Sequence, residues 1–405
     1  PPSVQSASEP RCRLPHVGKR VMQAGGSIPS QLRRIHFSVF FASIGLAYVY
    51  LIPAFAEDLG ASYLELGFIG TVRSVPYMFL PVIVGYLGDR FERRLLYLTS
   101  IFLAGSAILV LAAAQTIQGI IMVQVLLGIG FSLFWPLSEA MVSEAAPLRR
   151  RTAVMGTYGV AWASGFLIGP LLGGLIADAA GFQIAFLVAG IFVLATAGVS
   201  LALIRGTGKT RSHSIEALKP EGQLVRKLLP ILIIQIPYGI VFAFIAAIFP
   251  GYAAQSGLAP FEVGALVSGF GFARIVMFLL AGKFERIGEM KSAALAFVGV
   301  ATVMMLIPLN RSFLALLADM CLVGTFIGII YPQAVGYISK HSPSANLGFA
   351  IGLYETIFGI GFAVGPITSG FVAQVAGPDL AYLVLAVIAL SAIPTLVLSK
   401  RSYAK

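Results

Sequence analysis

Two stretches of this 405-residue chain, 196 residues apart, carry nearly the same pattern of glycine, proline and aliphatic residues. The first is Gly165-Phe-Leu-Ile-Gly169-Pro170-Leu-Leu-Gly173, and the second is Gly361-Phe-Ala-Val-Gly365-Pro366-Ile-Thr-Ser-Gly370. The same offset pairs Gly128 with Gly324, Trp135-Pro136 with Tyr331-Pro332, Pro147 with Pro343, and Tyr158 with Tyr354. The sequence therefore predicts an internal duplication of a several-helix unit, and repeats of this kind place a binding site at the interface between the two halves.

The composition indicates that the duplicated unit lies in a membrane. Apolar residues make up 58% of the chain and charged residues only 11%, and a soluble domain of this size could not cover such a surface with polar side chains. Because a bilayer core needs about 20 apolar residues per helix, the uncharged runs predict an all-α integral membrane protein with twelve transmembrane helices in two pseudo-symmetric six-helix bundles. The expected helices cover residues 35–56, 63–88, 95–113, 118–144, 153–177, 182–204, 227–250, 260–282, 292–309, 313–339, 347–374 and 380–399.

Polar segments divide the chain at its middle and at its ends. Residues 205–226 are polar and basic, and they are expected to link an N-terminal bundle over 33–204 to a C-terminal bundle over 227–400. Residues 1–32, rich in Pro, Ser, Gly and Arg, are expected to form a disordered basic tail. Residues 401–405 form a second, short tail.

The net charge of +11 indicates membrane orientation rather than a nucleic-acid partner. In the predicted topology, 25 of the 28 Lys and Arg residues lie in tails and loops on one side of the membrane, and only Arg311 lies in a loop on the other side. Short basic loops are retained in the cytoplasm. We therefore expect both termini to be cytoplasmic in a multi-pass protein of the cell membrane.

The sequence lacks the side-chain groupings of an enzyme or a metal centre. Its four His residues lie in tails, loops or helix ends, and neither Cys12 nor Cys321 belongs to a thiol pair. No nucleophile elbow occurs either. We therefore expect no enzymatic activity, no cofactor and no bound metal.

The segment between the second and third expected helices has a specific pattern. It reads Gly85-Tyr-Leu-Gly-Asp89-Arg90-Phe-Glu92-Arg93-Arg94 and resembles the signature loop of the major facilitator superfamily, G-x-x-x-D-R-x-G-R-[RK], with Glu92 where the family usually has Gly. A weaker copy, Glu285-Arg286-Ile-Gly288, stands at the duplicated place. With twelve helices and a basic central loop, the resemblance implies a secondary transporter similar to the drug/proton antiporter branch, in which two bundles rock about a central site.

The charged residues of these loops are expected to form a cytoplasmic gate. Asp89 at a helix end can accept hydrogen bonds from the positive N-terminus of a neighbouring helix, while the arginines reach nearby acids. The resemblance implies that Asp89 meets the start of the eleventh helix and that Glu144 joins the network. The alternative is that these charges only follow the positive-inside rule. The predicted gate residues are Gly85, Asp89, Arg90, Arg93, Arg94, Glu144, Glu285 and Arg286.

The fifth expected helix carries a glycine pattern that resembles the antiporter motif of the family's exporters. Small residues four apart let two helices approach closely, and proline loosens the local hydrogen-bond ladder. The motif and its looser copy in the eleventh helix therefore predict a pivot rather than a pocket. Ordinary small-residue packing is the alternative. The predicted pivot residues are Gly165, Gly169, Pro170, Gly173, Gly174, Gly361, Gly365 and Pro366.

Four ionisable residues fall at membrane depth: Arg73, Glu139, Arg274 and Glu355. Each costs about 2.5–3.5 kcal/mol on insertion scales and is expected to face a cavity or a partner. In one interpretation, Glu355 or Glu139 binds a proton that competes with substrate, and the arginines adjust its proton affinity, as in an antiporter. In a second, Arg73 and Arg274 clasp an anion, as in an organic-anion or oxyanion carrier. In a third, pairs such as Arg274 with Glu355 only fasten helices.

Glu355 is the first proton-coupling candidate because Gly159 stands at the equivalent position of the first repeat. The duplication therefore left a carboxylate in only one half. The family's exporters often carry an acid in the first helix, but this chain has none there before Glu57, and Gln124 replaces an arginine that is common in the fourth helix. Coupling by the usual residue is thus excluded.

The resemblance implies a central cavity lined by the first, fourth, seventh and tenth helices. An aromatic-rich, sparsely polar pocket suits hydrophobic or amphipathic compounds better than sugars. We therefore predict a monomer in the lipid bilayer that exports such a small molecule by using a proton gradient. An organic-anion carrier and a receptor or scaffold that transports nothing are the alternatives. The predicted cavity residues are Arg73, Arg274, Tyr48, Trp135, Gln235, Tyr238, Tyr331 and Gln333.

Overall fold

The computed structural model describes residues 30–146, 151–205, 222–342 and 347–402, which form helices and short connections with no strand in these ranges. The first half contains α1 (Ser30–Leu46), η1 (Ala47–Leu51), α2 (Ile52–Asp58), α3 (Tyr63–Arg90), α4 (Arg93–Leu111), α5 (Ile117–Ala145), α6 (Arg151–Ala180) and α7 (Phe182–Leu203). The second half contains α8 (Gly222–Ile233), α9 (Gln235–Ala247), α10 (Phe249–Gln255), α11 (Pro260–Leu279), α12 (Ala281–Glu285), α13 (Glu289–Leu306), η4 (Ile307–Leu309), α14 (Phe313–His341), α15 (Leu347–Ala376), α16 (Pro378–Leu390) and α17 (Ala392–Ser402).

When helices separated only by a short break are counted as one segment, they make the twelve predicted membrane segments in the predicted order. The all-α prediction is therefore confirmed. Eleven segments are long and apolar enough to cross a membrane, and α3, with 28 residues, completes the set. The seventh segment differs most from its predicted bounds, because α8 already begins at Gly222 and α10 continues to Gln255. Residues 222–226, predicted as linker, are therefore helical, while most of the predicted N-terminal tail lies outside the described residues.

Equivalent turns in the two halves use glycine in the same conformation. Gly60 and Gly257, which follow α2 and α10, have φ angles of 83° and 84°. Gly181 and Gly377, which precede α7 and α16, have φ angles of 90° and 86°. Positive φ costs glycine little because it has no Cβ. The predicted duplication is thus present in the backbone geometry of the turns.

The helices that follow α2 and α10 also begin in the same way. The Glu65 side chain accepts a hydrogen bond from the backbone N–H of Ser62 at 2.8 Å. Glu262 does the same for the backbone N–H of Ala259 at 2.9 Å. A glutamate three residues into a helix satisfies a backbone donor that the helix leaves without a partner. Both halves therefore start their second long helix with one capping arrangement.

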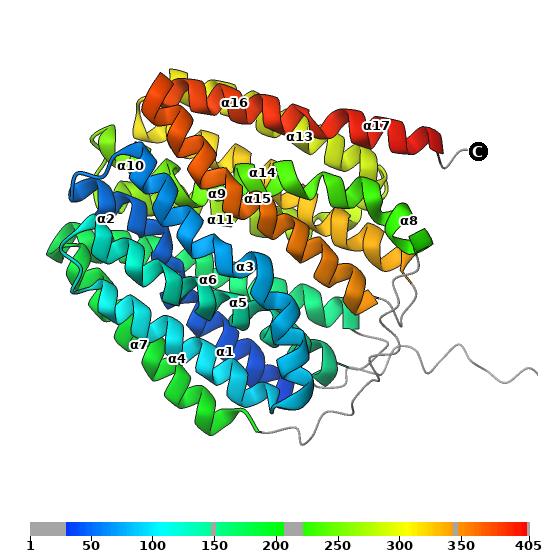
Figure 1. Ribbon diagram of the computed structural model, residues 1–405, viewed down its shortest axis with the longest axis horizontal. Coiled ribbons are helices and arrows are strands. Elements are labelled where there is room, and N and C mark those ends of the chain that lie inside the picture. Colours follow the sequence, from blue (N-terminus) through cyan, green and yellow to red (C-terminus); the bar gives the residue numbers. More distant parts are fainter. Residues whose placement is uncertain (1–29, 147–150, 206–221, 343–346, 403–405) are drawn as a thin grey trace, which may run out of the picture.

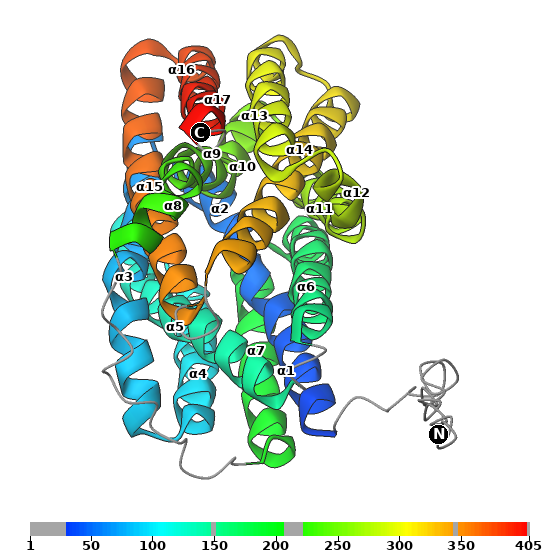
Figure 2. The same ribbon diagram turned by 90° about the vertical axis from the view of Figure 1, so that its right-hand side faces the viewer.

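The helices gather into two bundles, α1–α7 on one side and α8–α17 on the other (Figure 2). Helix α3 of the first bundle packs along α15 of the second, and α6 packs along α11. Figure 1 shows α3 beside α15, with the ends of α8 and α17 on one side of the molecule and those of α2 and α10 on the other. We call the side where α3 ends and α8 begins the basic end, and the opposite side the far end.

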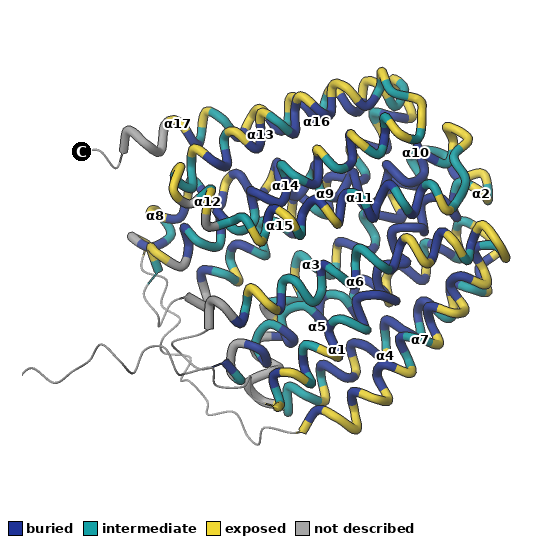
Figure 3. Tube along the Cα trace, turned by 180° about the vertical axis from the view of Figure 1, so that it is seen from behind, coloured by how far each residue is buried: buried dark blue, intermediate teal, exposed yellow. Residues whose placement is uncertain are grey.

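The burial pattern is that of a protein surrounded by lipid. Residues that face neighbouring helices are buried, whereas those along the outward edges of α4, α7, α13 and α16 are exposed (Figure 3). Many exposed side chains are large and apolar, such as Phe102, Met122 and Val387. An apolar outer surface of this kind is compatible with a bilayer as solvent.

Candidate functional site

A cavity of about 170 Å³ lies between the two bundles, and its wall brings together all four of the predicted membrane-depth charges. Both bundles contribute to it through η1, α3, α5 and α6 of the first half and α9, α11, α14 and α15 of the second. Aromatic side chains form most of the wall. The lining residues are Val49, Tyr50, Arg73, Tyr77, Phe131, Trp135, Glu139, Trp162, Phe166, Tyr238, Phe242, Ala246, Arg274, Tyr331, Tyr354, Glu355, Phe358 and Phe362.

The two carboxyl groups come from different bundles. Glu139 belongs to α5 and Glu355 to α15. The hydroxyl of Tyr77, on α3, donates a hydrogen bond to Glu355 Oε2 at 3.2 Å. Because Tyr77 is in the first bundle, this bond joins the two bundles at the cavity wall.

Arg274 is surrounded by aromatic rings. Its guanidinium carbon lies 5.3 Å from the centroid of the Trp162 ring, 5.0 Å from that of Phe242, 5.2 Å from that of Phe270 and 5.5 Å from that of Phe278. These are cation–π distances. Trp162 comes from the first bundle and the other three rings from the second, so Arg274 is held at the junction of α6 and α11.

Neither cavity arginine forms an ion pair with a cavity glutamate among the described residues. The Nη1 atom of Arg73 donates to the backbone carbonyl of Val49 at 3.3 Å. The Nε atom of Arg274 is buried with no hydrogen-bond partner in the described structure. The third interpretation of the sequence, in which Arg274 and Glu355 fasten helices as a pair, therefore has no such ion pair to support it.

Three predicted cavity residues besides the arginines line the cavity, and three do not. Trp135, Tyr238 and Tyr331 are part of the wall. Tyr48 instead packs its ring against the backbone of Gly173. The amide of Gln235 donates to the carbonyl of Ile231 on its own helix at 3.0 Å, and that of Gln333 donates to the carbonyl of Ala281 at 3.3 Å. These three side chains are not part of the cavity wall. The resemblance identified the helices but not their rotation.

Several wall residues were not predicted, although the sequence contains a signal for them. Tyr77 follows Arg73 by four residues, and Phe358 and Phe362 follow Glu355 by three and seven. Residues at these spacings share one face of a helix. The residues that share a helix face with a membrane-depth charge can be listed from helical periodicity, and that list includes Tyr77, Phe358 and Phe362. Tyr50 and Trp162 lie on helices without a membrane-depth charge, so this signal does not reach them.

The predicted cytoplasmic gate lies at the basic end, where the structure describes only part of it. The surroundings of Gly85 and the side chains of Asp89, Arg90, Glu144 and Glu285 lie outside the described part of the structure. Arg94 donates to the carbonyl of Leu201 at 2.7 Å and so ties the start of α4 to the end of α7. Arg93 begins α4, and Arg286 is exposed just after α12. The gate stays a prediction.

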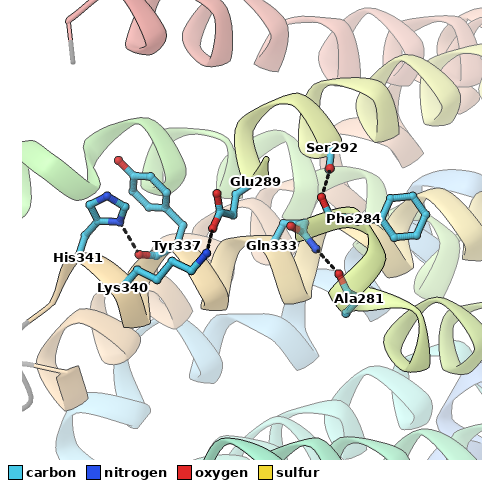
Figure 4. Close-up of polar contacts among 8 residues, drawn as sticks. All are labelled: Ala281, Phe284, Glu289, Ser292, Gln333, Tyr337, Lys340 and His341. Carbon is cyan, nitrogen blue, oxygen red and sulfur yellow. Dashed lines mark hydrogen bonds and ion pairs between the residues drawn. The ribbon is translucent and has the colours of Figure 1, made fainter. Parts of the chain in front are cut away.

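Polar contacts at the basic end also hold the second bundle together (Figure 4). Lys340 of α14 forms an ion pair with Glu289 of α13 at 2.5 Å. The Ser292 hydroxyl donates to the carbonyl of Phe284 at 2.9 Å, and these two contacts lie beside the bond from Gln333 to Ala281. The amide of Gln333 is therefore part of this packing.

The predicted pivot glycines allow close contact between helices. A Cβ at Gly169 would lie 2.3 Å from the carbonyl oxygen of Ile44 on α1, and one at Gly361 would lie 2.3 Å from that of Ile236 on α9. Gly165 also faces α1, Gly173 faces η1, and Gly365 faces α9. Pro170 and Pro366 lie inside the continuous helices α6 and α15. These glycines pack α6 and α15 within their own bundles, whereas Gly174 faces Pro260 of the other bundle.

Two six-helix bundles of apolar helices with a shared, charged cavity define the class of multi-pass membrane transporters. The model of the major facilitator superfamily matches residues 35–234 and 231–405, and the chain belongs to that family. It is not an enzyme. Among the described residues, no three His, Cys, Asp or Glu side chains are grouped so as to hold a metal ion.

The chain is similar over most of its length to other transporters. It is 24% identical to an uncharacterized MFS-type transporter of Methanocaldococcus jannaschii, over 87% of this chain and 93% of that one. It is 24% identical to the multi-drug resistance efflux pump PmrA of Streptococcus pneumoniae, over 82% and 86% of the two chains. The crystal structure of the nucleoside transporter NupG aligns with a TM-score of 0.74 at 13% identity, over 91% and 98% of the two chains.

Proposed function

We propose that this protein exports a small aromatic or amphipathic molecule in exchange for protons, with Glu355 and Glu139 as the proton-binding groups. The observation that carries the proposal is the presence of one carboxyl group from each bundle on the wall of one cavity. A buried carboxylate must be hydrogen-bonded, paired or protonated. A group in that position can exchange its proton for a substrate when the cavity changes its access.

The hydrogen bond from Tyr77 to Glu355 supports a link between protonation and conformation. It joins α3 of one bundle to α15 of the other. An ionised carboxylate accepts such a bond more strongly than a neutral one. Protonation of Glu355 therefore weakens one contact between the bundles, and movement of the bundles alters the environment of the proton site.

The direction of transport is proposed from the efflux pump among the relatives. The orientation is proposed from the basic loops, which would place both termini in the cytoplasm of a cell-membrane protein. With that orientation, the basic end faces the cytoplasm and the far end faces outward.

Proteoliposomes test the proposed coupling. Ethidium serves as a fluorescent aromatic probe, and pyranine trapped inside the vesicles reports proton movement. We expect the wild-type protein to accumulate ethidium when a pH gradient is applied. We expect Glu355→Gln to abolish this accumulation but to equilibrate ethidium as the wild type does when no gradient is applied. Glu57→Gln, at the end of α2 and absent from the cavity wall, is the matched control. Unchanged accumulation by both Glu355→Gln and Glu139→Gln would contradict the proposal.

An organic-anion carrier is the second candidate, favoured by two cavity guanidinium groups that have no carboxylate partner among the described residues. In that case, Arg73→Gln and Arg274→Gln should abolish uptake of radiolabelled benzoate and leave ethidium transport only modestly altered. Loss of ethidium transport with intact benzoate uptake would reject this candidate.

A further inference from the structure

Apart from Arg73, which donates to the backbone carbonyl of Val49, the charges on the cavity wall form two groups of opposite sign, Arg274 and the two glutamates. Arg274 lies among four aromatic rings, and none of its immediate ring neighbours carries a charge. Glu139 and Glu355 share the cavity wall, and Glu355 has the Tyr77 hydroxyl as its hydrogen-bond partner. Opposite charges that share one small cavity are usually paired. Here the described residues leave both groups without an opposite partner.

The arginine group lacks acceptors. A guanidinium carries five N–H donors and no acceptor. Arg274 is only 6% exposed, yet its Nε has no hydrogen-bond partner in the described structure. Cation–π contacts cover the faces of the guanidinium but do not satisfy the donors at its edge. A ligand carboxylate that accepts two parallel hydrogen bonds from the guanidinium, one of them from Nε–H, would satisfy this buried donor.

Aromatic rings lie between the arginine and the glutamates. The Tyr238 ring lies 6.1 Å from the Phe242 ring beside Arg274 and 5.4 Å from that of Phe358, three residues after Glu355. The Tyr331 ring lies 5.8 Å from the Phe278 ring beside Arg274 and 6.3 Å from that of Tyr354, next to Glu355 in sequence. Trp135 contacts the rings of Trp162 and Phe166 with centroids 5.6 and 5.8 Å apart. Tyr238, Tyr331 and Trp135 line the cavity. The space between the two charged groups is therefore lined by surfaces on which a flat apolar body can stack.

We propose that the substrate of this cavity is an amphoteric aromatic compound, whose acid group binds Arg274, whose ring stacks between the tyrosine and tryptophan side chains, and whose amine binds Glu139 and Glu355. This assignment rests on the proposed function and adds the substrate class. It also gives the exchange a chemical basis, because the ammonium group of the substrate and a proton would compete for the same carboxylates. Binding of one ammonium group to the carboxylates would release one proton from them.

Arg274 could instead act only as packing between α6 and α11. Its contact with Trp162 of the other bundle would then stabilise the protein equally with any ligand or with none. The two roles differ in a measurable way. A ligand-binding Arg274 determines which compounds bind, whereas a packing Arg274 changes the unfolding temperature and leaves the order of ligand affinities unchanged.

The test is a binding measurement with matched compounds on the purified full-length protein. 4-(Aminomethyl)benzoate carries both charges on one ring, 4-methylbenzoate carries only the acid, 4-methylbenzylamine only the amine, and 4-methylbenzyl alcohol neither. A biphenyl homologue of the amphoteric compound places the charges farther apart. Dose-dependent thermal stabilisation in detergent gives an apparent affinity for each. We expect one of the two amphoteric compounds to bind roughly tenfold or more tightly than each singly charged compound, as a buried charged hydrogen bond would give.

Variants assign the two ends of the ligand. Arg274→Gln should remove the contribution of the acid group, so that the amphoteric compound binds no better than 4-methylbenzylamine. Arg274→Lys keeps the charge but loses the bidentate, planar contact, so it should recover only part of the preference. Glu355→Gln should remove the contribution of the amine in the same way. Arg311→Gln and Glu57→Gln lie outside the cavity wall and should leave every affinity unchanged.

The proposal is overturned if neither amphoteric compound binds more tightly than its singly charged relatives, or if Arg274→Gln and Arg274→Lys lower the unfolding temperature without changing the order of affinities. Because binding is measured without a gradient, these outcomes are independent of the ethidium test. Failed amphoteric binding with intact pH-driven ethidium transport rejects the substrate class alone. Amphoteric binding with no pH-driven transport rejects the proton coupling alone.

Discussion

The hydroxyl of Thr71 bonds to the backbone of α15, where it accepts a hydrogen bond from the N–H of Ile367 at 3.1 Å. It also donates to the carbonyl of Ala363 at 2.9 Å. In an uninterrupted helix, the N–H of residue 367 would bond to the carbonyl of residue 363 directly. A side chain of the first bundle therefore bonds to both the donor and the acceptor of one backbone pair of the second bundle, next to Pro366.

Replacing Thr71 should weaken the contact between the bundles. Thr71→Val keeps the shape of the side chain but removes the hydroxyl, so we expect a loss of about 1 kcal/mol from this arrangement. Spin labels at Asp58→Cys and Gln255→Cys, at the exposed ends of α2 and α10, would then report longer distances between the bundles. Thr71→Ser retains the hydroxyl and is the control. An unchanged distance distribution in Thr71→Val would show that the bonds of the Thr71 hydroxyl to α15 have no conformational role.

Gly169 should tolerate no side chain. A Cβ there would lie 2.3 Å from the carbonyl oxygen of Ile44, a backbone atom that cannot move without displacing α1. We expect Gly169→Ala to destabilise the protein by about 1–3 kcal/mol, as overpacking does. Gly156 is on the same helix with open space around it, so Gly156→Ala should be neutral or stabilising by up to about 1 kcal/mol. Thermal unfolding in detergent compares the two, and equal effects would contradict this packing.

The ion pair at the far end should contribute little to stability. Arg311 and Asp379 are 3.4 Å apart, and both side chains are 57% exposed. Exposed pairs are typically worth about 0.2–1 kcal/mol because water and salt screen them. We expect Arg311→Gln and Asp379→Asn to lower the unfolding temperature only slightly, and less so in high salt. Arg311 also donates to the Tyr252 hydroxyl, so Asp379→Asn is the variant that reports on the pair alone. A large loss in Asp379→Asn would assign the pair a role beyond surface charge.

The orientation in the membrane can be tested by labelling. Leu309 is 77% exposed at the far end, and Ile287 is 49% exposed at the basic end. In a background lacking Cys12 and Cys321, a membrane-impermeant maleimide added to intact cells should label Leu309→Cys and leave Ile287→Cys unlabelled. Permeabilised cells should label both. Labelling of Ile287→Cys alone in intact cells would invert the proposed topology.

Much of the architecture could be predicted from sequence because its causes are local. Long apolar runs determine the helices, and the repeat around Gly165 and Gly361 determines their grouping into two halves. The four membrane-depth charges were also identifiable, since an isolated charge in an apolar helix needs a cavity or a partner. The cavity contains all four side chains. Their proposed roles stay predictions.

The contacts that organise the cavity could not be predicted because they depend on how the bundles meet. Nothing near Tyr77 in the sequence indicates that its hydroxyl reaches Glu355, which is 278 residues away. Likewise, the rings around Arg274 come from both halves, and Trp162 joins them only through the packing of α6 on α11. Tyr48 and Gln235 lie outside the cavity wall for the same reason, since the rotation of a helix in a bundle depends on its neighbours.

The charges of the cavity have no counterparts across the duplication. At an offset of 196 residues, Glu355 corresponds to Gly159 and Glu139 corresponds to Val335. At the offset of 197 that relates the turns after α2 and α10, Arg274 corresponds to Tyr77. A protein assembled from two copies of either half would therefore carry a different set of charges. A form with two identical halves could not carry this polarity, so it depends on the sequence differences between the halves.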